Sequence, residues 1–197
     1  FRVYMMVANL EPLLAYFHEG FLRLSMFEYE RTSTTLMSHI TNTQLAKNNK
    51  GAKGGLSLDE QMWSFEKLNS FLNNEFTDLR SDWVYNFLTP EMKRIMIHMV
   101  RMSRNEFIPH PGLFEIWGCD FFVDANFKVW FIECNGSPAY QATTKEKGII
   151  QTAMLREAME LQFDIVKNGV ETKYEVKSWE PIIDERKSSI EERYFGL

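Results

Sequence analysis

The sequence predicts an α+β fold in which helices pack against an antiparallel sheet. Short apolar runs separated by turn residues open the chain, two aromatic runs near residues 114–138 have a hairpin pattern, and other segments have helical spacing. Of the 197 residues, 45% are hydrophobic and 25% are charged, which is typical of a globular protein. A length of 197 residues is enough for one domain of ordinary size.

The first 26 residues have the pattern of a three-stranded antiparallel meander. The first run is almost wholly apolar, which predicts a strand that is buried on both faces. Pro12 and Gly20 mark the two expected turns because proline and glycine interrupt strands. The expected strands cover residues 2–8, 13–18 and 21–26, and the expected turns cover residues 9–12 and Glu19-Gly20.

Two helices are predicted in the middle of the chain. Ser57 and Glu60 have the spacing of a capping box, so we expect a helix to begin at Ser57. Pro90 follows Thr89 as a first-turn proline follows an N-cap, which predicts a second helix over residues 90–105. The apolar positions are Leu58, Met62, Phe65, Leu68 and Leu72 in the first helix, and Met92, Ile95, Met96, Met99 and Val100 in the second.

A third and longer helix is predicted after the hairpin. Apolar residues recur at helical spacing over residues 145–168, and Gly169 is a suitable stop. Residues 169–197 are rich in charge and have only scattered apolar residues. We therefore expect them to form a charged C-terminal extension, either as a peripheral helix or wrapped over the surface.

The most informative stretch is the hairpin formed by residues 114–124 and 128–138. Glu133 and Asn135 are two residues apart on one strand, so their side chains leave the same face, and Asp120 can meet them from the partner strand. Three oxygen donors on one patch would suit Mg²⁺, which takes its other ligands from water and nucleotide phosphates. The alternative is a buried hairpin whose polar residues are satisfied by the backbone. We rank it lower because polar side chains among Trp, Phe and Ile need a reason to be there.

The composition indicates the redox compartment of the protein and excludes some classes of partner. Cys119 and Cys134 are the two cysteines of the chain, and we interpret them as small buried thiols in a reducing compartment, not as a disulfide. A net charge of −5 argues against a nucleic-acid partner. No apolar run approaches the roughly 20 residues that a membrane span needs, so we expect no membrane partner.

Together these motifs resemble the tubulin tyrosine ligase-like amino-acid ligases, a branch of the ATP-grasp superfamily. The resemblance covers roughly residues 1–166 and follows the order of the family's motifs. It implies an ATP-grasp-like fold, and we expect an incomplete one, in which residues 1–168 are the C-terminal portion of the catalytic domain and residues 169–197 are the charged extension. The matching strings are Arg-x-Tyr from Arg2, Glu-Gly and Arg from Glu19 to Arg23, His-Ile-Thr-Asn from His39 with Lys47 after it, Phe-Glu-Ile-Trp-Gly-Cys-Asp from Phe114, and Trp-Phe-Ile-Glu-Cys-Asn-Gly-Ser-Pro from Trp130.

The resemblance also implies roles for particular residues. A guanidinium can clamp a phosphate or a carboxylate through two parallel hydrogen bonds, which suits arginines at a phosphoryl-transfer site. We expect His39 to have a structural role through hydrogen bonding. The implied catalytic residues are Arg2 and Arg23, the implied nucleotide-contacting residues are Asn42, Lys47, Asp120, Glu133 and Asn135, and the implied magnesium ligands are Asp120, Glu133 and Asn135.

The implied function is an ATP-dependent ligase with ATP and Mg²⁺ as cofactors. Such an enzyme phosphorylates a carboxylate of tubulin or microtubules, and the amine of a free amino acid then attacks the acylphosphate. We expect glutamate as the amino acid, because glutamate addition is the commonest activity in the family, and a cytoplasmic location at the microtubule cytoskeleton or the cilium. We expect the chain alone to be inactive, because the lysines and the glycine-rich loop that hold the nucleotide in the family are not found in it.

Three alternatives stay open. The first is a ligase that adds glycine or tyrosine. The second is a catalytically inactive structural protein of microtubules or cilia that keeps the ligase fold. The third is an ATP-grasp ligase that acts on a small molecule, and the motifs at Arg23 and at residues 39–47 weigh against it.

Overall fold

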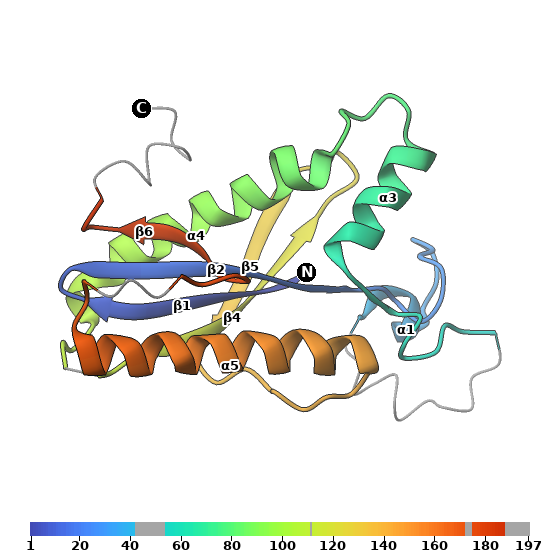
Figure 1. Cartoon of the computed structure of the whole chain (residues 1–197). Coiled ribbons are helices and arrows are strands. Elements are labelled where there is room, and N and C mark those ends of the chain that lie inside the picture. The colour runs from blue at the N-terminus through green and yellow to red at the C-terminus, as the bar shows by residue number, and fades with distance from the viewer. Residues whose placement is uncertain (42–53, 111, 172–174, 188–197) are drawn as a thin grey trace.

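A sheet of six antiparallel strands forms the centre of the molecule in a computed structural model (Figure 1). The structure describes residues 1–41, 54–110, 112–171 and 175–187. The strands pair in the order β3-β2-β1-β4-β5. Strand β6 also pairs with β2, at residues 14–17, whereas β3 pairs with β2 at residues 22–23. The predicted α+β class is confirmed. The strands are β1 (Arg2–Leu10), β2 (Leu13–Arg23), β3 (Met62–Trp63), β4 (Glu115–Val123), β5 (Val129–Asn135) and β6 (Glu180–Asp184).

Helices cover both faces of this sheet. Figure 1 shows α5 along one face and α4 with α3 on the other. Alternate residues of β1 therefore enter two different cores: Val3, Met5 and Val7 pack on the α4 side, and Tyr4, Met6 and Ala8 pack on the α5 side. This explains why β1 is apolar at nearly every position, as predicted. The helices are α1 (Leu36–His39), α3 (Phe65–Glu75), α4 (Thr89–Ser103) and α5 (Lys145–Asn168), with a π-helical turn at Val84–Leu88 and a 3₁₀ turn at Arg104–Glu106.

Strand β2 corrects the predicted meander. The chain does not turn at Glu19-Gly20 but continues as one strand to Arg23, so the predicted second and third strands are one strand. The pairing of β1 with β2 shifts at this point, which identifies the pair as a β-bulge. A Cβ atom on Gly20 would lie 2.1 Å from the carbonyl oxygen of Arg2. The glycine is thus needed for a close approach between strands, not for a turn.

Helix starts were only partly predicted. Ser57 and Glu60 do form the reciprocal hydrogen bonds of a capping box, but the chain then enters β3, and α3 begins after Ser64, whose hydroxyl accepts from the Lys67 N–H at 3.1 Å. Thr89 is not the N-cap of α4, because the preceding π-helical turn runs directly into that helix. A sequence signal for a capping box is local, whereas the strand that comes after it depends on pairing with β2.

The C-terminal helix was predicted correctly, but the segment after it was not. Helix α5 spans Lys145–Asn168 and ends at Gly169, which has a positive φ of 81°. Beyond it, Ile182 and Ile183 are wholly buried in β6, which joins the sheet, whereas a peripheral helix or a surface wrapping was expected. The division of the chain at residue 168 stays a prediction.

The two cysteines correct a further expectation. Cys119 of β4 is paired directly with Cys134 of β5, and the two are joined by a disulfide in the structure. The interpretation as separate thiols is therefore wrong here. The strand register is what places the two cysteines directly opposite each other, with their Cα atoms 4.1 Å apart. With the two cysteines joined, they no longer indicate a reducing compartment. Among the described residues, no helix has the length and apolar character that crossing a membrane requires.

A buried histidine in β2 predicts a loss of stability in acid. His18 is 7% exposed, between the rings of Tyr4 and Trp179, and burial lowers its pKa from 6.5 to about 4. Below pH 6.5 the unfolded chain takes up a proton that the folded chain refuses until about pH 4, so stability falls as the pH falls across this window. We expect this residue to account for about 3 kcal/mol of that loss.

The measurement is urea unfolding of the protein and of His18→Phe at pH 7 and at pH 4.5. The phenylalanine keeps the ring but does not titrate, so the variant should lose clearly less stability between the two pH values. An equal loss in both proteins would show that other groups, such as the carboxylates, carry the whole effect.

Candidate functional site

Strand pairing brings three of the predicted site residues into one row across the sheet. Arg2 of β1 is paired with Asp120 of β4, and Asp120 is paired with Glu133 of β5. Arg23 ends β2 next to this row. Because paired residues share a face of the sheet, the row is a consequence of the register of the strands alone.

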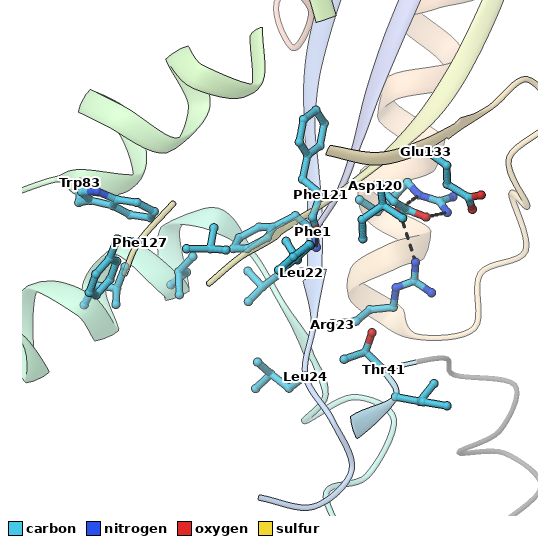
Figure 2. Close-up of a pocket in the computed structure, with 17 residues that line it drawn as sticks. Phe1, Leu22, Arg23, Leu24, Thr41, Trp83, Asp120, Phe121, Phe127 and Glu133 are labelled. Carbon is cyan, nitrogen blue, oxygen red and sulfur yellow. Dashed lines mark hydrogen bonds and ion pairs between the residues drawn. The ribbon is translucent and has the colours of Figure 1, made fainter. Parts of the chain in front are cut away.

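Asp120 lies between two arginines. Its carboxylate accepts hydrogen bonds from Arg2 Nε at 2.6 Å and from Arg2 Nη2 at 2.7 Å, and Arg23 Nη2 lies 3.7 Å from its Oδ1 atom. The side chains of Arg2, Asp120 and Arg23 are 14%, 16% and 25% exposed. Figure 2 shows Arg23 pointing toward Asp120 from below, with Glu133 to the upper right of Asp120.

The two arginines have different electrostatic environments. Burial by itself would lower the pKa of Arg2, but the hydrogen bonds and the charge of Asp120 outweigh burial and raise this pKa. The pKa of Arg23 is lowered by burial, and Arg2 adds to that effect while Asp120 opposes it. The charge of Arg23 is thus less well compensated, so an anion near it would be stabilised.

Glu133 and Asn135 lie side by side on β5. Glu133 is exposed, and Asn135 Nδ2 donates a hydrogen bond to its Oε1 atom at 3.0 Å. Together with Asp120 they offer two carboxylates and one amide, a set of hard oxygen donors that fits Mg²⁺. Among the described residues, no group of three or more His, Cys, Asp and Glu side chains could hold a metal ion, so a magnesium site would need the amide of Asn135 and phosphate oxygens.

Two cavities meet at Arg2 and Arg23. The first, of about 790 Å³, has a charged end at the two arginines, Asp120 and Glu133. Its other end is apolar and includes Trp83 and Phe127 (Figure 2). The second, of about 360 Å³, is bordered by the same arginines, by Asn135 and by the loop after β5. The predicted metal ligands are therefore divided, with Glu133 at the first cavity and Asn135 at the second.

Similar proteins identify the family of this chain. The sequence profile described as "Tubulin-tyrosine ligase family" matches residues 1–172. The chain belongs to the tubulin-tyrosine ligase family. The protein polyglycylase TTLL10 of Macaca fascicularis is 30% identical over 172 residues, which are 86% of this chain and 28% of that protein. The protein named inactive polyglycylase TTLL10 of Homo sapiens is 29% identical over 172 residues, 86% of this chain and 25% of the relative.

A further relative has a different named activity. The probable tubulin polyglutamylase ttll-9 of Caenorhabditis elegans is 28% identical over 190 residues, 94% of this chain and 43% of that protein. The chain thus spans from about a quarter to less than half of the length of these relatives.

The structure brings together five of the seven site residues that the resemblance to the tubulin-tyrosine ligase family implied. These are Arg2, Arg23, Asp120, Glu133 and Asn135, and their roles stay predictions. Asn42 and Lys47 lie outside the described residues. His39 has the hydrogen bonding that was expected, because its Nε2 atom lies 2.7 Å from the carbonyl oxygen of Ser33.

One cavity residue was missed. Lys147 lies in the first turn of α5, is 8% exposed and borders the second cavity. The sequence does contain a signal for it: a lysine in the first turn of a predicted helix is unfavourable, because its charge opposes the helix dipole. The sequence does not show that Lys147 borders a cavity, because this depends on the packing of α5 beside the loop after β5.

Gly118 of β4 leaves space for the side chain of Arg2. A Cβ atom there would lie 2.8 Å from Pro138 Cβ and 2.9 Å from Arg2 Nη1. We expect Gly118→Ala to displace Arg2 and to destabilise the fold by about 1–3 kcal/mol, as overpacking does. Urea unfolding measures this loss.

Gly136→Ala is the matched control for that variant. A Cβ atom at Gly136 would meet only the end of the flexible side chain of Glu115 closely, at 2.7 Å, and that end can move away. We expect its stability to stay within about 0.5 kcal/mol of the parent. Equal losses in the two variants would contradict a specific packing role of Gly118.

Proposed function

We propose that this chain supplies the catalytic end of an ATP-dependent amino-acid ligase that modifies tubulin carboxylates. The observation that carries the proposal is the row of Arg2, Asp120 and Glu133, with Arg23 beside it, at the mouth of a cavity of about 790 Å³. Two cations and two carboxylates at one place are what phosphoryl transfer needs for positioning and charge compensation. Membership of the tubulin-tyrosine ligase family supports the same reaction class.

Each residue has a role that its contacts support. Asp120 orients the guanidinium of Arg2 through two hydrogen bonds, so Arg2 meets an incoming anion in a fixed geometry. Arg23, whose charge is less compensated, attracts the phosphate or the carboxylate and offsets negative charge that develops during transfer. Glu133, Asn135 and Asp120 would hold Mg²⁺. ATP, bound with Mg²⁺, supplies the phosphoryl group that turns the acceptor carboxylate into an acylphosphate, and the amine of the free amino acid then displaces phosphate.

The proposed ligase also needs a particular free amino acid as its second substrate. Glutamate was predicted from the commonness of that activity in the family. Two of the three relatives described above are named polyglycylases and one is named a probable polyglutamylase, which gives specific support to glycine. We therefore propose glycine or glutamate as the amino acid, and the cytoplasmic microtubule cytoskeleton or the cilium as the place where the protein acts.

The test is incorporation of isotope-labelled glycine, glutamate and tyrosine into tubulin by the complete natural polypeptide, with ATP and Mg²⁺. We expect one of the first two to be incorporated and tyrosine not to be. Absence of incorporation with all three amino acids would favour the second candidate, an inactive structural protein. That candidate is supported by the human relative, whose name calls it inactive.

A further inference from the structure

A third cavity lies at an unpaired stretch of β2. Strand β6 pairs with β2 at residues 14–17 and β3 pairs with it at residues 22–23, both on the edge that β1 does not occupy. Residues 18–21 of that edge have no strand partner in the described part of the chain. The cavity, of about 660 Å³, lies over this gap and shares no described lining residue with the other two cavities.

Glu157 of α5 fixes one side of the gap. Its carboxylate accepts hydrogen bonds from the backbone N–H groups of Lys177 and Ser178. These contacts hold the chain against α5 just before β6, so pairing with β2 begins only at Glu180. On the other side, the chain leaves β2 after Trp63 and begins α3. The gap is therefore bounded on both sides by fixed parts of the fold.

The lining of this third cavity has a surplus of acidic side chains. Its described charged residues are four glutamates and one lysine: Glu19, Glu66, Glu146, Glu180 and Lys177. Glu180 is paired with Lys93. Glu66 and Glu146 lie in the first turns of α3 and α5, where the helix dipole stabilises an acidic side chain. The positions of these three glutamates are therefore explained without a ligand.

Glu19 has no such explanation. It lies within β2 and is partly buried, and no hydrogen bond or ion pair reaches its carboxylate from the described residues. Burial raises the pKa of Glu19, while the charge of Lys93 lowers it and that of Glu180 raises it. A carboxylate that is buried without a partner costs free energy, and a cation in the cavity would remove that cost.

His18 is a second polar residue of this cavity that lacks a partner. It is 7% exposed, and its ring packs edge-on against that of Trp179, with 5.2 Å between the centroids. The backbone of Glu19 lies close enough to raise the pKa of the ring, but the buried Nδ1 atom makes no hydrogen bond of normal geometry with a described residue. Buried polar groups are nearly always hydrogen-bonded, so this one indicates a bound group in the cavity.

Tyr85 supplies an exposed aromatic ring to the same cavity. It is 40% exposed. Burial raises the pKa of its hydroxyl, and the nearby charges of Glu19 and Glu66 raise it further. A planar guanidinium can stack on such a ring and donate hydrogen bonds to carboxylates at the same time. A metal ion fits less well, because no group of three or more His, Cys, Asp and Glu side chains in the described part of the chain could hold one.

We infer that the third cavity binds an arginine side chain of a partner polypeptide, with Glu19 and Glu66 as its anionic partners. The unpaired edge of β2 can also pair with the backbone of the extended segment that carries the arginine. Ligand sites commonly measure roughly 300–1,000 Å³, so a cavity of about 660 Å³ has room for the side chain and its neighbouring backbone. The site is separate from the proposed ligase site and adds partner binding to the proposed function.

The experiment measures binding of short peptides to the complete natural polypeptide by fluorescence anisotropy. The probes are a labelled Gly-Ser-Arg-Ser-Gly peptide and two versions in which lysine or citrulline replaces the arginine. Citrulline has nearly the shape of arginine but carries no charge. We expect the arginine peptide to bind, and the citrulline peptide to bind about tenfold more weakly or worse.

Two variants of the protein remove one carboxylate each. Glu19→Gln should weaken binding of the arginine peptide by about tenfold, and Glu66→Gln, which changes an exposed side chain, by about threefold. Glu75→Gln makes the same charge change at an exposed residue of α3 that does not border the cavity, so it should leave binding unchanged. Urea unfolding should show that Glu19→Gln is at least as stable as the parent, because a neutral group costs less to bury.

Three results would contradict the inference. The first is equal binding of the arginine and citrulline peptides to the parent protein, or binding of neither. The second is that Glu19→Gln and Glu66→Gln both bind the arginine peptide as Glu75→Gln does. The third is tighter binding of the lysine peptide, which would overturn arginine as the ligand and identify an ammonium group in its place.

Discussion

Glu133→Gln should remove ligase turnover while leaving the fold intact. The side chain is exposed, and the hydrogen bond that it accepts from Asn135 can also be accepted by a glutamine oxygen. We therefore expect the free energy of unfolding to change by no more than about 0.5 kcal/mol. The lost charge, in contrast, belongs to the proposed Mg²⁺ ligands, and we expect kcat to fall by about a hundredfold or more.

The measurement is amino-acid incorporation by the complete natural polypeptide over a range of free Mg²⁺ concentrations. If Glu133 binds the metal, the variant should also need more Mg²⁺ to reach half of its maximal rate. Glu115→Gln is the matched control, because Glu115 is an exposed glutamate at the start of β4 in the same hairpin, and Glu115 does not border either cavity. Unchanged turnover in Glu133→Gln would show that the magnesium assignment is wrong.

The part of the row that lies in the hairpin, Asp120 and Glu133, was predictable because its causes are local. Alternation along a strand decides which side chains share a face, so the common face of Glu133 and Asn135 is a consequence of their spacing. The two runs of the hairpin are close in sequence, and their register is set by a short turn in which the carboxylate of Asp124 accepts from the N–H groups of Asn126 and Lys128. Asp120 could thus be placed near Glu133 before the rest of the chain was known.

The features that escaped prediction depend on contacts between distant parts of the chain. Gly20 looked like a turn residue, and only the approach of the Arg2 carbonyl oxygen shows that it belongs to a bulge. The capping box at Ser57 forms its hydrogen bonds, but pairing of Met62 with Arg23 makes the next segment a strand and not a helix. Local preference is a weak guide wherever a tertiary partner competes with it.

Lys147 illustrates the same limit at the site. Its position at the start of a predicted helix does not show which cavity it borders, because the two arginines of that cavity come from strands more than 120 positions earlier in the chain. Its burial is produced by the packing of α5 against the sheet, where Gln151 donates hydrogen bonds to the hydroxyl of Tyr4 and to the carbonyl of Ala139. The loop after β5 is thereby held against α5.

Asp120→Asn should have a large effect on both stability and activity. The change leaves Arg2 and Arg23 without the carboxylate that separates their charges, and the new amide group turns a donor toward the donors of Arg2. Removing one partner of a buried ion pair costs about 3 kcal/mol, and we expect a loss near that size because the three side chains are mostly buried. Urea unfolding at low and high salt measures it, and salt should reduce the loss in the variant by screening the two arginines.

A double variant separates the structural part of this effect from the chemical part. Replacing Arg2 and Asp120 together, as in Arg2→Met with Asp120→Leu, removes the uncompensated charge of Arg2 and leaves only the weaker contact of Arg23 without its carboxylate. Replacement of both members of a buried ion pair is often neutral for stability. We therefore expect the double variant to regain most of the stability that Asp120→Asn loses. It should regain no turnover, because the arginine that faces the phosphate or the carboxylate is gone. If the double variant were as unstable as Asp120→Asn, the stability loss would come from side-chain packing and not from the uncompensated charge. If the double variant were active, Arg2 would have no part in the reaction. The proposed role of Asp120 in positioning Arg2 would then be wrong as well.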